Sequence, residues 1–149
     1  ASDHAYSKAI YTEGYAPYEQ CLHSEMKRQG SWTDVYGVAA TLYVMLTGQR
    51  LPSGLERRDA IQSKRSDPLQ PARRIVPDLP PALDVVLGRA LKVEPEQRLQ
   101  TVLELTQQLE GVLAEEAKKP PNTPQKSPRK FYPLAAAIAL LLVILLWGG

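Results

Sequence analysis

Apolar residues recur at helical spacing in four stretches of this chain, and no competing stretch has the two-residue period of a strand. Residues 35–46 (VYGVAATLYVML) are apolar on nearly every side, which is typical of a helix buried inside a domain. Gly48 follows and is expected to end that helix. Ser53 and Glu56 form a capping box, which predicts a short amphipathic helix to about Ser63.

Two further helices are predicted in the second half of the chain. Pro81 stands where a first helical turn tolerates proline, and apolar residues follow at helical spacing over residues 83–91. Thr101 and Glu104 form a second capping box, and an apolar face continues over residues 105–113. Residues 1–30 lack a sustained period and are expected to be mostly loop, with a short helix near residues 19–24. The predicted fold class of this part is all-α.

The C-terminal stretch differs from the rest because residues 131–147 carry no charge. At about 1.5 Å per residue they would reach roughly 25 Å, near the lower limit for crossing a hydrocarbon core of about 30 Å. Tyr132 and Trp147 stand at its two ends, where such rings favour the headgroup region. We predict one transmembrane helix over residues 131–149. The alternatives are a buried core helix and a hydrophobic tail removed on lipid attachment.

The segment before that helix, residues 115–130, is rich in proline and lysine and has no large apolar side chain, which predicts a disordered linker. Its bases precede the predicted span, so the positive-inside tendency favours a single-pass protein of the inner or plasma membrane with residues 1–130 cytoplasmic. The linker can also contact anionic headgroups of the lipid bilayer.

Charge divides the 149 residues in the same way. Residues 1–117 hold all 16 acids and 13 of the 18 bases, whereas residues 118–149 hold five bases and no acid. Acids and bases interleave in the first part, so we expect no nucleic-acid partner. The chain begins at Ala1 in polar sequence without an initiator Met, and we expect a cut there rather than a natural start.

Motifs for metal binding or catalysis are absent from the sequence. Two histidines and one cysteine cannot close a tetrahedral metal site unless carboxylates complete it. Cys21 and His23 have no orienting third group or oxyanion hole near them in sequence. No glycine-rich phosphate loop is present. We therefore predict no metal site and no cofactor site in this chain.

Three segments carry motifs in a recognisable order and spacing. Residues 12–20 read TEGYAPYEQ, residues 32–48 begin WTDVY and end MLTG, and residues 82–101 end EPEQRLQT. Together they resemble the C-terminal lobe of bacterial, membrane-anchored serine/threonine protein kinases of the eukaryotic-like type: the end of the activation segment, the central buried helix and the two closing helices. The resemblance covers about residues 11–113. It implies that residues 1–114 are a portion of such a lobe.

The resemblance also implies roles for individual residues. A loop that docks the substrate residue just after the phosphoacceptor comprises Thr12, Gly14, Tyr15, Ala16 and Pro17. Thr12 resembles the threonine that binds the catalytic aspartate. In the family, the carboxylate and guanidinium that correspond to Glu19 and Arg98 form a buried bidentate pair, which pins the activation segment to the lobe. Without the resemblance, the two would be interpreted as solvated surface charges.

Asp34 opens the apolar stretch, so we expect its carboxylate to cap the first N–H groups of the central helix. The resemblance adds that it would hold the backbone of the catalytic loop. Three residues depart from the family's pattern, and Tyr18 occupies the position where proline usually precedes the glutamate. Ala39 and Leu99 likewise replace a usual glycine and a usual proline.

The parts that phosphoryl transfer requires do not occur in this sequence: no glycine-rich loop, strand lysine, HRD or DFG is present. In the family these lie before the activation segment, so we expect this chain alone to be inactive. ATP and Mg²⁺ would bind only the full-length kinase. The expected partners are therefore the missing N-terminal part of the kinase, a protein substrate and the membrane.

Two functions remain open at this point. The chain supplies substrate docking and scaffold to a membrane-anchored serine/threonine kinase, or it is a non-catalytic, pseudokinase-like interaction module at the membrane. An unrelated helical membrane protein is a third, weaker alternative.

Overall fold

The computed structural model describes residues 13–22 and 28–119, which form helices and contain no strand. The all-α prediction is therefore confirmed for this part of the chain. The elements follow in the order α1 (Tyr18–Cys21), α2 (Ser31–Thr47), α3 (Gly54–Gln62), α4 (Ala72–Ile75), α5 (Pro81–Ala90), the 3-10 helix η2 (Pro95–Gln97) and α6 (Val102–Lys118).

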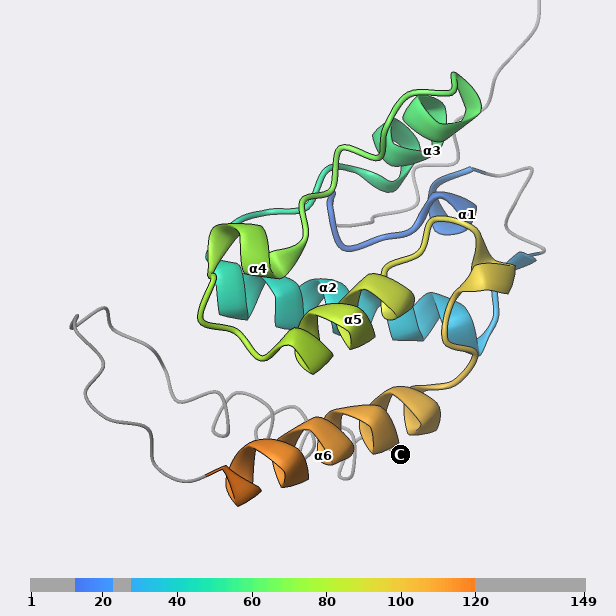
Figure 1. Cartoon of the computed structure of the whole chain (residues 1–149). Coiled ribbons are helices and arrows are strands. Elements are labelled where there is room, and N and C mark those ends of the chain that lie inside the picture. Colours follow the sequence, from blue (N-terminus) through green and yellow to red (C-terminus); the bar gives the residue numbers. More distant parts are fainter. Residues whose placement is uncertain (1–12, 23–27, 120–149) are drawn as a thin grey trace, which may run out of the picture.

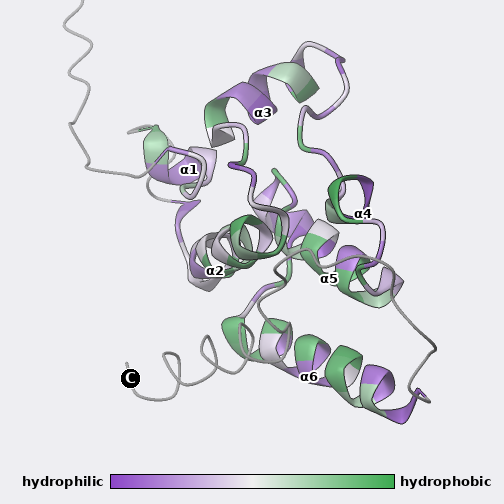
Figure 2. Cartoon of the chain, turned by 90° about the vertical axis from the view of Figure 1, so that its left-hand side faces the viewer, coloured by the Kyte–Doolittle hydropathy of each residue, from purple (hydrophilic) through white to green (hydrophobic). Residues whose placement is uncertain are grey.

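Helix α2 forms the centre of the fold, as its apolar sequence predicts. Helices α5 and α6 pack against each other and against α2 (Figure 1). Helix α4 lies at one end of α2, and α3 and α6 lie on opposite sides of α2 and α5. Figure 2 shows that α6 turns hydrophobic residues toward α2 and α5 and keeps hydrophilic residues on its outer edge. The fully buried side chains of this core include Val35, Leu42, Leu83, Leu87, Leu99 and Leu105.

The predicted helix starts are confirmed at two positions and wrong at a third. The hydroxyls of Ser53 and Thr101 accept hydrogen bonds from the third residue of α3 and α6, at 3.2 and 3.1 Å. Asp34 does not cap α2, because the helix begins at Ser31 and Asp34 is already its fourth residue, with an exposed side chain. Thr33 instead accepts from the backbone N–H of Gly30, at 3.2 Å.

Helix α6 is longer than predicted. It continues to Lys118, so residues 115–118, which the sequence assigned to the linker, are helical. Glu115, Glu116 and Ala117 are good helix formers, and a lysine in the last turn complements the negative end of the helix dipole. The side chain of Lys119 pairs with Glu116 at this end.

No helix of residues 13–22 and 28–119 is long and apolar enough to span a membrane. The predicted transmembrane helix at residues 131–149 and the rest of the predicted linker lie outside the described residues.

Candidate functional site

The residues predicted to form a docking loop directly precede α1. The structure describes four of the five, and Thr12 lies outside the described residues. Gly14, Ala16 and Pro17 are buried and Tyr15 is half-buried. The loop is therefore a packed segment of the fold and not a projecting one.

Two glycines allow the loop to lie directly on the segment that leads into α3. Gly14 has a φ of +87°, and a Cβ there would lie 2.8 Å from the carbonyl oxygen of Leu51. A Cβ at Gly54 would lie 2.7 Å from the backbone nitrogen of Tyr18 and 2.8 Å from the carbonyl oxygen of Ala16. All three distances are too short for a side chain, so these two backbones approach as closely as glycine permits.

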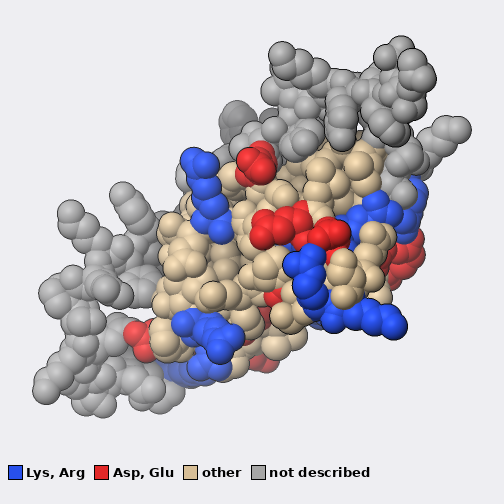
Figure 3. Space-filling view, turned by 90° about the horizontal axis from the view of Figure 1, so that it is seen from above, with Lys and Arg blue, Asp and Glu red and all other residues tan. Residues whose placement is uncertain are grey.

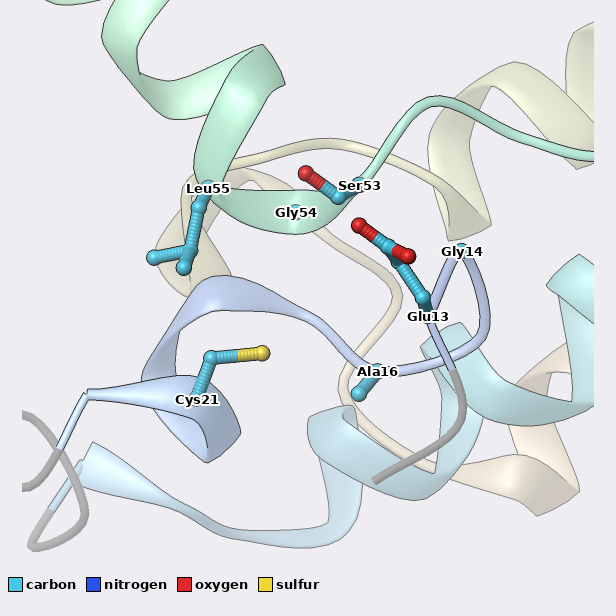
Figure 4. Close-up of a pocket in the computed structure, with 7 residues that line it drawn as sticks. All are labelled: Glu13, Gly14, Ala16, Cys21, Ser53, Gly54 and Leu55. Carbon is cyan, nitrogen blue, oxygen red and sulfur yellow. The ribbon is translucent and has the colours of Figure 1, made fainter. Parts of the chain in front are cut away.

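A small pocket opens between this loop and the start of α3 (Figure 4). It is lined by Glu13, Gly14, Ala16, Cys21, Ser53, Gly54 and Leu55. Its free volume of about 30 Å³ is room for about one water molecule, whereas pockets for drug-sized ligands measure about 300–1,000 Å³. The pocket does not fit a nucleotide.

Cys21 faces this pocket with its thiol (Figure 4). Burial, reinforced by the carboxylates of Glu19 and Glu13, raises the pKa of Cys21 to about 11. The thiol therefore stays protonated at neutral pH, and a protonated thiol is a poor nucleophile. Its sulfur lies 3.4 Å from the carbonyl oxygen of Pro17, which gives it a local structural contact.

The structure brings Glu19 and Arg98 together across 79 residues of sequence. Nη1 of Arg98 donates to Oε1 of Glu19 at 2.8 Å, and both side chains are fully buried. The resemblance implied a bidentate pair, and the structure corrects this. Oε2 of Glu19 is buried and has no hydrogen-bond partner among the described residues. Thr33 adds a long hydrogen bond of 3.4 Å to the same oxygen, Oε1. The ion pair therefore holds α1 through a single carboxylate oxygen.

Arg98 is bound to three backbone carbonyls as well as to Glu19. Its guanidinium donates to the carbonyl oxygens of Lys92, Trp32 and Val93 at 3.0, 2.8 and 2.9 Å. These bonds occupy its three nitrogens, and they join the start of α2 to the segment that surrounds η2. Arg98 is thus the fixed side of the pair, and Glu19 binds to a guanidinium that the backbone already holds.

A second buried arginine, Arg57 of α3, was missed by the sequence analysis. Nε and Nη2 of Arg57 donate to the two carboxylate oxygens of Asp67 at 2.9 and 2.7 Å, which is a bidentate geometry. Nη2 also donates to the carbonyl oxygen of Leu91 at 2.8 Å, and Nη1 to the hydroxyl of Tyr36 at 3.0 Å. Only 2% of the Arg57 side chain is exposed, against 33% for Asp67.

The two arginine sites share one aromatic side chain. The guanidinium of Arg98 lies 5.0 Å from the ring centre of Tyr36, and that of Arg57 lies 5.8 Å from the same centre. Both distances fall in the range of cation–π contacts. Tyr36 is itself buried in α2, so it links the docking-loop side of the fold to α3.

Neither a basic surface on the face seen from above nor a metal-binding cluster is found among the described residues. Figure 3 shows acidic and basic side chains next to one another on the face seen from above, so its described part presents no extended basic surface. No group of three His, Cys, Asp or Glu side chains that could hold a metal ion occurs within residues 13–22 and 28–119.

Comparison with known proteins identifies similar segments. The chain is 39% identical over 74 residues to the serine/threonine-protein kinase PknB of Mycolicibacterium smegmatis, a match that spans 49% of this chain and 12% of the relative. A solved chain described as "PpkA-294 apo form" superposes with a TM-score of 0.54 at 30% identity, over 67% of this chain and 32% of that one. No family model matches. Part of this chain is therefore similar to part of a bacterial serine/threonine kinase, and the matched residues span a minor share of each relative.

Proposed function

We propose that this chain supplies the substrate-docking loop and the lobe scaffold of a membrane-anchored serine/threonine protein kinase. The observation that carries the proposal is the buried contact between Glu19 and Arg98, which holds the end of the loop to a segment 79 residues away. A free-standing helical domain has no need to bury a carboxylate at the end of an irregular loop, since the desolvation costs several kcal/mol per ion unless it is offset. A loop that must present a fixed surface to a peptide gains from that contact.

Phosphoryl transfer itself belongs to residues outside this chain in the proposal. The sequence holds neither a catalytic-loop aspartate nor a magnesium-binding motif, and the pocket beside the docking loop does not fit a nucleotide. ATP and Mg²⁺ would bind a preceding part of the same protein. The uncharged residues 131–147 and the bases before them support an anchor in the inner or plasma membrane, with the kinase in the cytoplasm.

The test begins with the DNA that precedes the codon for Ala1. We expect an in-frame HRDxxxxN and DFG within the length of a kinase lobe. The protein that includes them should transfer phosphate from Mg-ATP to serine or threonine in a degenerate peptide library. Chain 1–149 alone should show no Mg-ATP binding in titration calorimetry.

Three outcomes would contradict the proposal. Micromolar Mg-ATP binding by chain 1–149 would place a nucleotide site where we see none. A longer protein that transfers no phosphate would remove the kinase function. A stop or start codon near Ala1 would favour the non-catalytic interaction module instead.

A further inference from the structure

Tyr18 is one of three residues that depart from the kinases this chain resembles, and it occupies a buried junction of the fold. It follows the docking loop directly, begins α1, and is 1% exposed. Its hydroxyl donates to Oε2 of Glu94 at 3.1 Å, across 76 residues of sequence. The same hydroxyl accepts from Nη1 of Arg28 at 2.9 Å, and Nη2 of Arg28 donates to Glu96 at 2.6 Å. The phenol therefore joins α1, the segment before α2, and η2.

Helix α3 contacts Tyr18 in two further ways. The guanidinium of Arg58 lies 4.3 Å from the centre of the Tyr18 ring, which is close for a cation–π contact. A Cβ at Gly54 would lie only 2.7 Å from the backbone nitrogen of Tyr18, so the first turn of α3 packs directly against the Tyr18 backbone. Side chain and backbone of this one residue are thus both held by α3.

A second anchor matters because the neighbouring ion pair is a single contact. Glu19 uses one oxygen toward Arg98, so this ion pair fixes α1 at one point. Helix α1 has only four residues, too few to be stable by itself, so its orientation depends on side-chain contacts. Tyr18 and Glu19 are consecutive and both bind the 94–98 segment, which fixes two points instead of one.

The hydroxyl of Tyr18 is suited to this task because it stays protonated. Burial, followed by the negative charge and the hydrogen bond of Glu94, raises the pKa of Tyr18 to about 12. The positive charges of Arg28 and Arg58 oppose this shift without cancelling it. At neutral pH the phenol therefore donates to Glu94 and accepts from Arg28 at once.

We propose that Tyr18 is a positioning residue for peptide docking: its hydroxyl sets the orientation of α1 and thereby the shape of residues 14–17. The inference rests on the proposed kinase function. A loop that changes shape would bind the peptide less well before reaction and in the transition state alike. The loss should therefore appear in KM for the peptide and not in kcat.

The test compares Tyr18→Phe with Tyr43→Phe in the longer, membrane-anchored protein. Tyr43 is an equally buried tyrosine whose hydroxyl donates to the carbonyl oxygen of Gln70 at 2.9 Å, away from the docking loop. We expect Tyr18→Phe to raise the KM for the peptide roughly three- to tenfold, with kcat and the KM for ATP unchanged. Tyr43→Phe should leave all three constants within about twofold.

An exchange experiment on chain 1–149 separates this inference from the kinase function. Amide hydrogens of residues 14–16 should exchange roughly tenfold faster in Tyr18→Phe than in Tyr43→Phe. If the longer protein transfers no phosphate, the proposed function fails while this measurement still decides the role of Tyr18. Equal exchange in the two variants would overturn the inference, and so would a fall in kcat with an unchanged KM.

Glu94 provides a second route to the same answer. Glu94→Gln keeps an oxygen that accepts from Tyr18, so the amides of residues 14–16 should exchange as fast as in the wild type. In Glu94→Leu these amides should exchange as fast as in Tyr18→Phe. The double variant Tyr18→Phe/Glu94→Leu should lose no more loop protection than either single variant. Additive losses would show that the two side chains act separately and would contradict the proposal.

Discussion

Two arginines lie buried beside the ring of Tyr36, and they differ in what surrounds their carboxylate partners. Arg98 meets Glu19 inside the fold, where neither side chain is exposed, and the two are 79 residues apart. Arg57 meets Asp67 at the edge of the fold, where a third of the aspartate side chain is exposed and the two are ten residues apart. The first pair joins α1 to the segment between η2 and α6, and the second closes a local loop after α3.

The less buried of the two pairs has the more complete hydrogen bonding. The exposed-edge pair is bidentate, with hydrogen bonds of 2.9 and 2.7 Å, whereas the fully buried pair uses one oxygen at 2.8 Å. The contribution of a buried pair to the free energy of unfolding therefore does not follow from its number of hydrogen bonds. It depends on what remains when one partner is removed, because a stranded charge costs most where water cannot reach it.

The largest effect is expected for Arg98→Met. This change leaves the Glu19 carboxylate buried, with only the long hydrogen bond from Thr33. We expect a loss of about 3–5 kcal/mol in the free energy of unfolding, measured by urea denaturation at pH 7. A loss below about 1 kcal/mol would show that water reaches Glu19 and would remove the difference between the two sites.

Arg57→Met is expected to cost less, about 1–3 kcal/mol in the same assay. Asp67 can turn its exposed oxygen to water, so the cost comes mainly from the hydroxyl of Tyr36 and the carbonyl of Leu91, which lose their donor. A loss equal to that of Arg98→Met would contradict the role given to solvent exposure.

Tyr36→Phe tests whether the shared ring couples the two sites. The change removes the oxygen that accepts from Arg57 and keeps the ring beside Arg98. We expect a loss of about 0.5–1.5 kcal/mol that does not add to the loss of Arg57→Met. The loss should add to that of Arg98→Met. If the Tyr36→Phe/Arg98→Met double variant loses less free energy of unfolding than the sum of the two single variants, the hydroxyl couples directly to Arg98.

The smallest effect is expected in acid, through Asp67. Burial raises the pKa of Asp67, but the hydrogen bonds from Arg57 and from the amide of Leu69 outweigh it, so the pKa lies below its usual value. A lowered pKa contributes stability above the unfolded value near 4, and that stability is lost as the pH falls through the folded value. The stability difference between wild type and Asp67→Asn should therefore be constant from pH 5 to 7 and shrink below about pH 4. A difference that persists unchanged at pH 2.5 would place its origin elsewhere.

The two arginine sites also differ in how well the sequence predicts them. Glu19 and Arg98 were paired through the resemblance of their motifs, since neither periodicity nor charge joins residues so far apart. Arg57 lies in GLERRDAIQ, which has the composition of an exposed polar helix, and hydropathy places arginine on the outside. It is buried because Asp67, the hydroxyl of Tyr36 and the carbonyl of Leu91 accept its hydrogen bonds, and no local pattern marks these pairings.

The helices were easier to predict than their ends. Apolar periodicity located α2, α5 and α6, because their buried faces are nearly free of polar residues. The cap of α2 was placed at Asp34 because an acid before an apolar run usually marks a helix start. Thr33 is bound instead to Gly30 and to Glu19, so the start of α2 follows from a tertiary contact that the sequence does not display.

We expect Arg98 to hold residues 14–20 in place and Arg57 to stabilise the fold without acting on that segment. Amide hydrogen exchange of residues 14–20 tests it most directly, in chain 1–149 and its variants Arg98→Met and Arg57→Met, under conditions that keep each fully folded. Arg98→Met should speed exchange there by at least tenfold beyond any change in residues 83–91, whereas Arg57→Met should leave the exchange of residues 14–20 unchanged. Equal acceleration by both variants, or none by Arg98→Met, would contradict it.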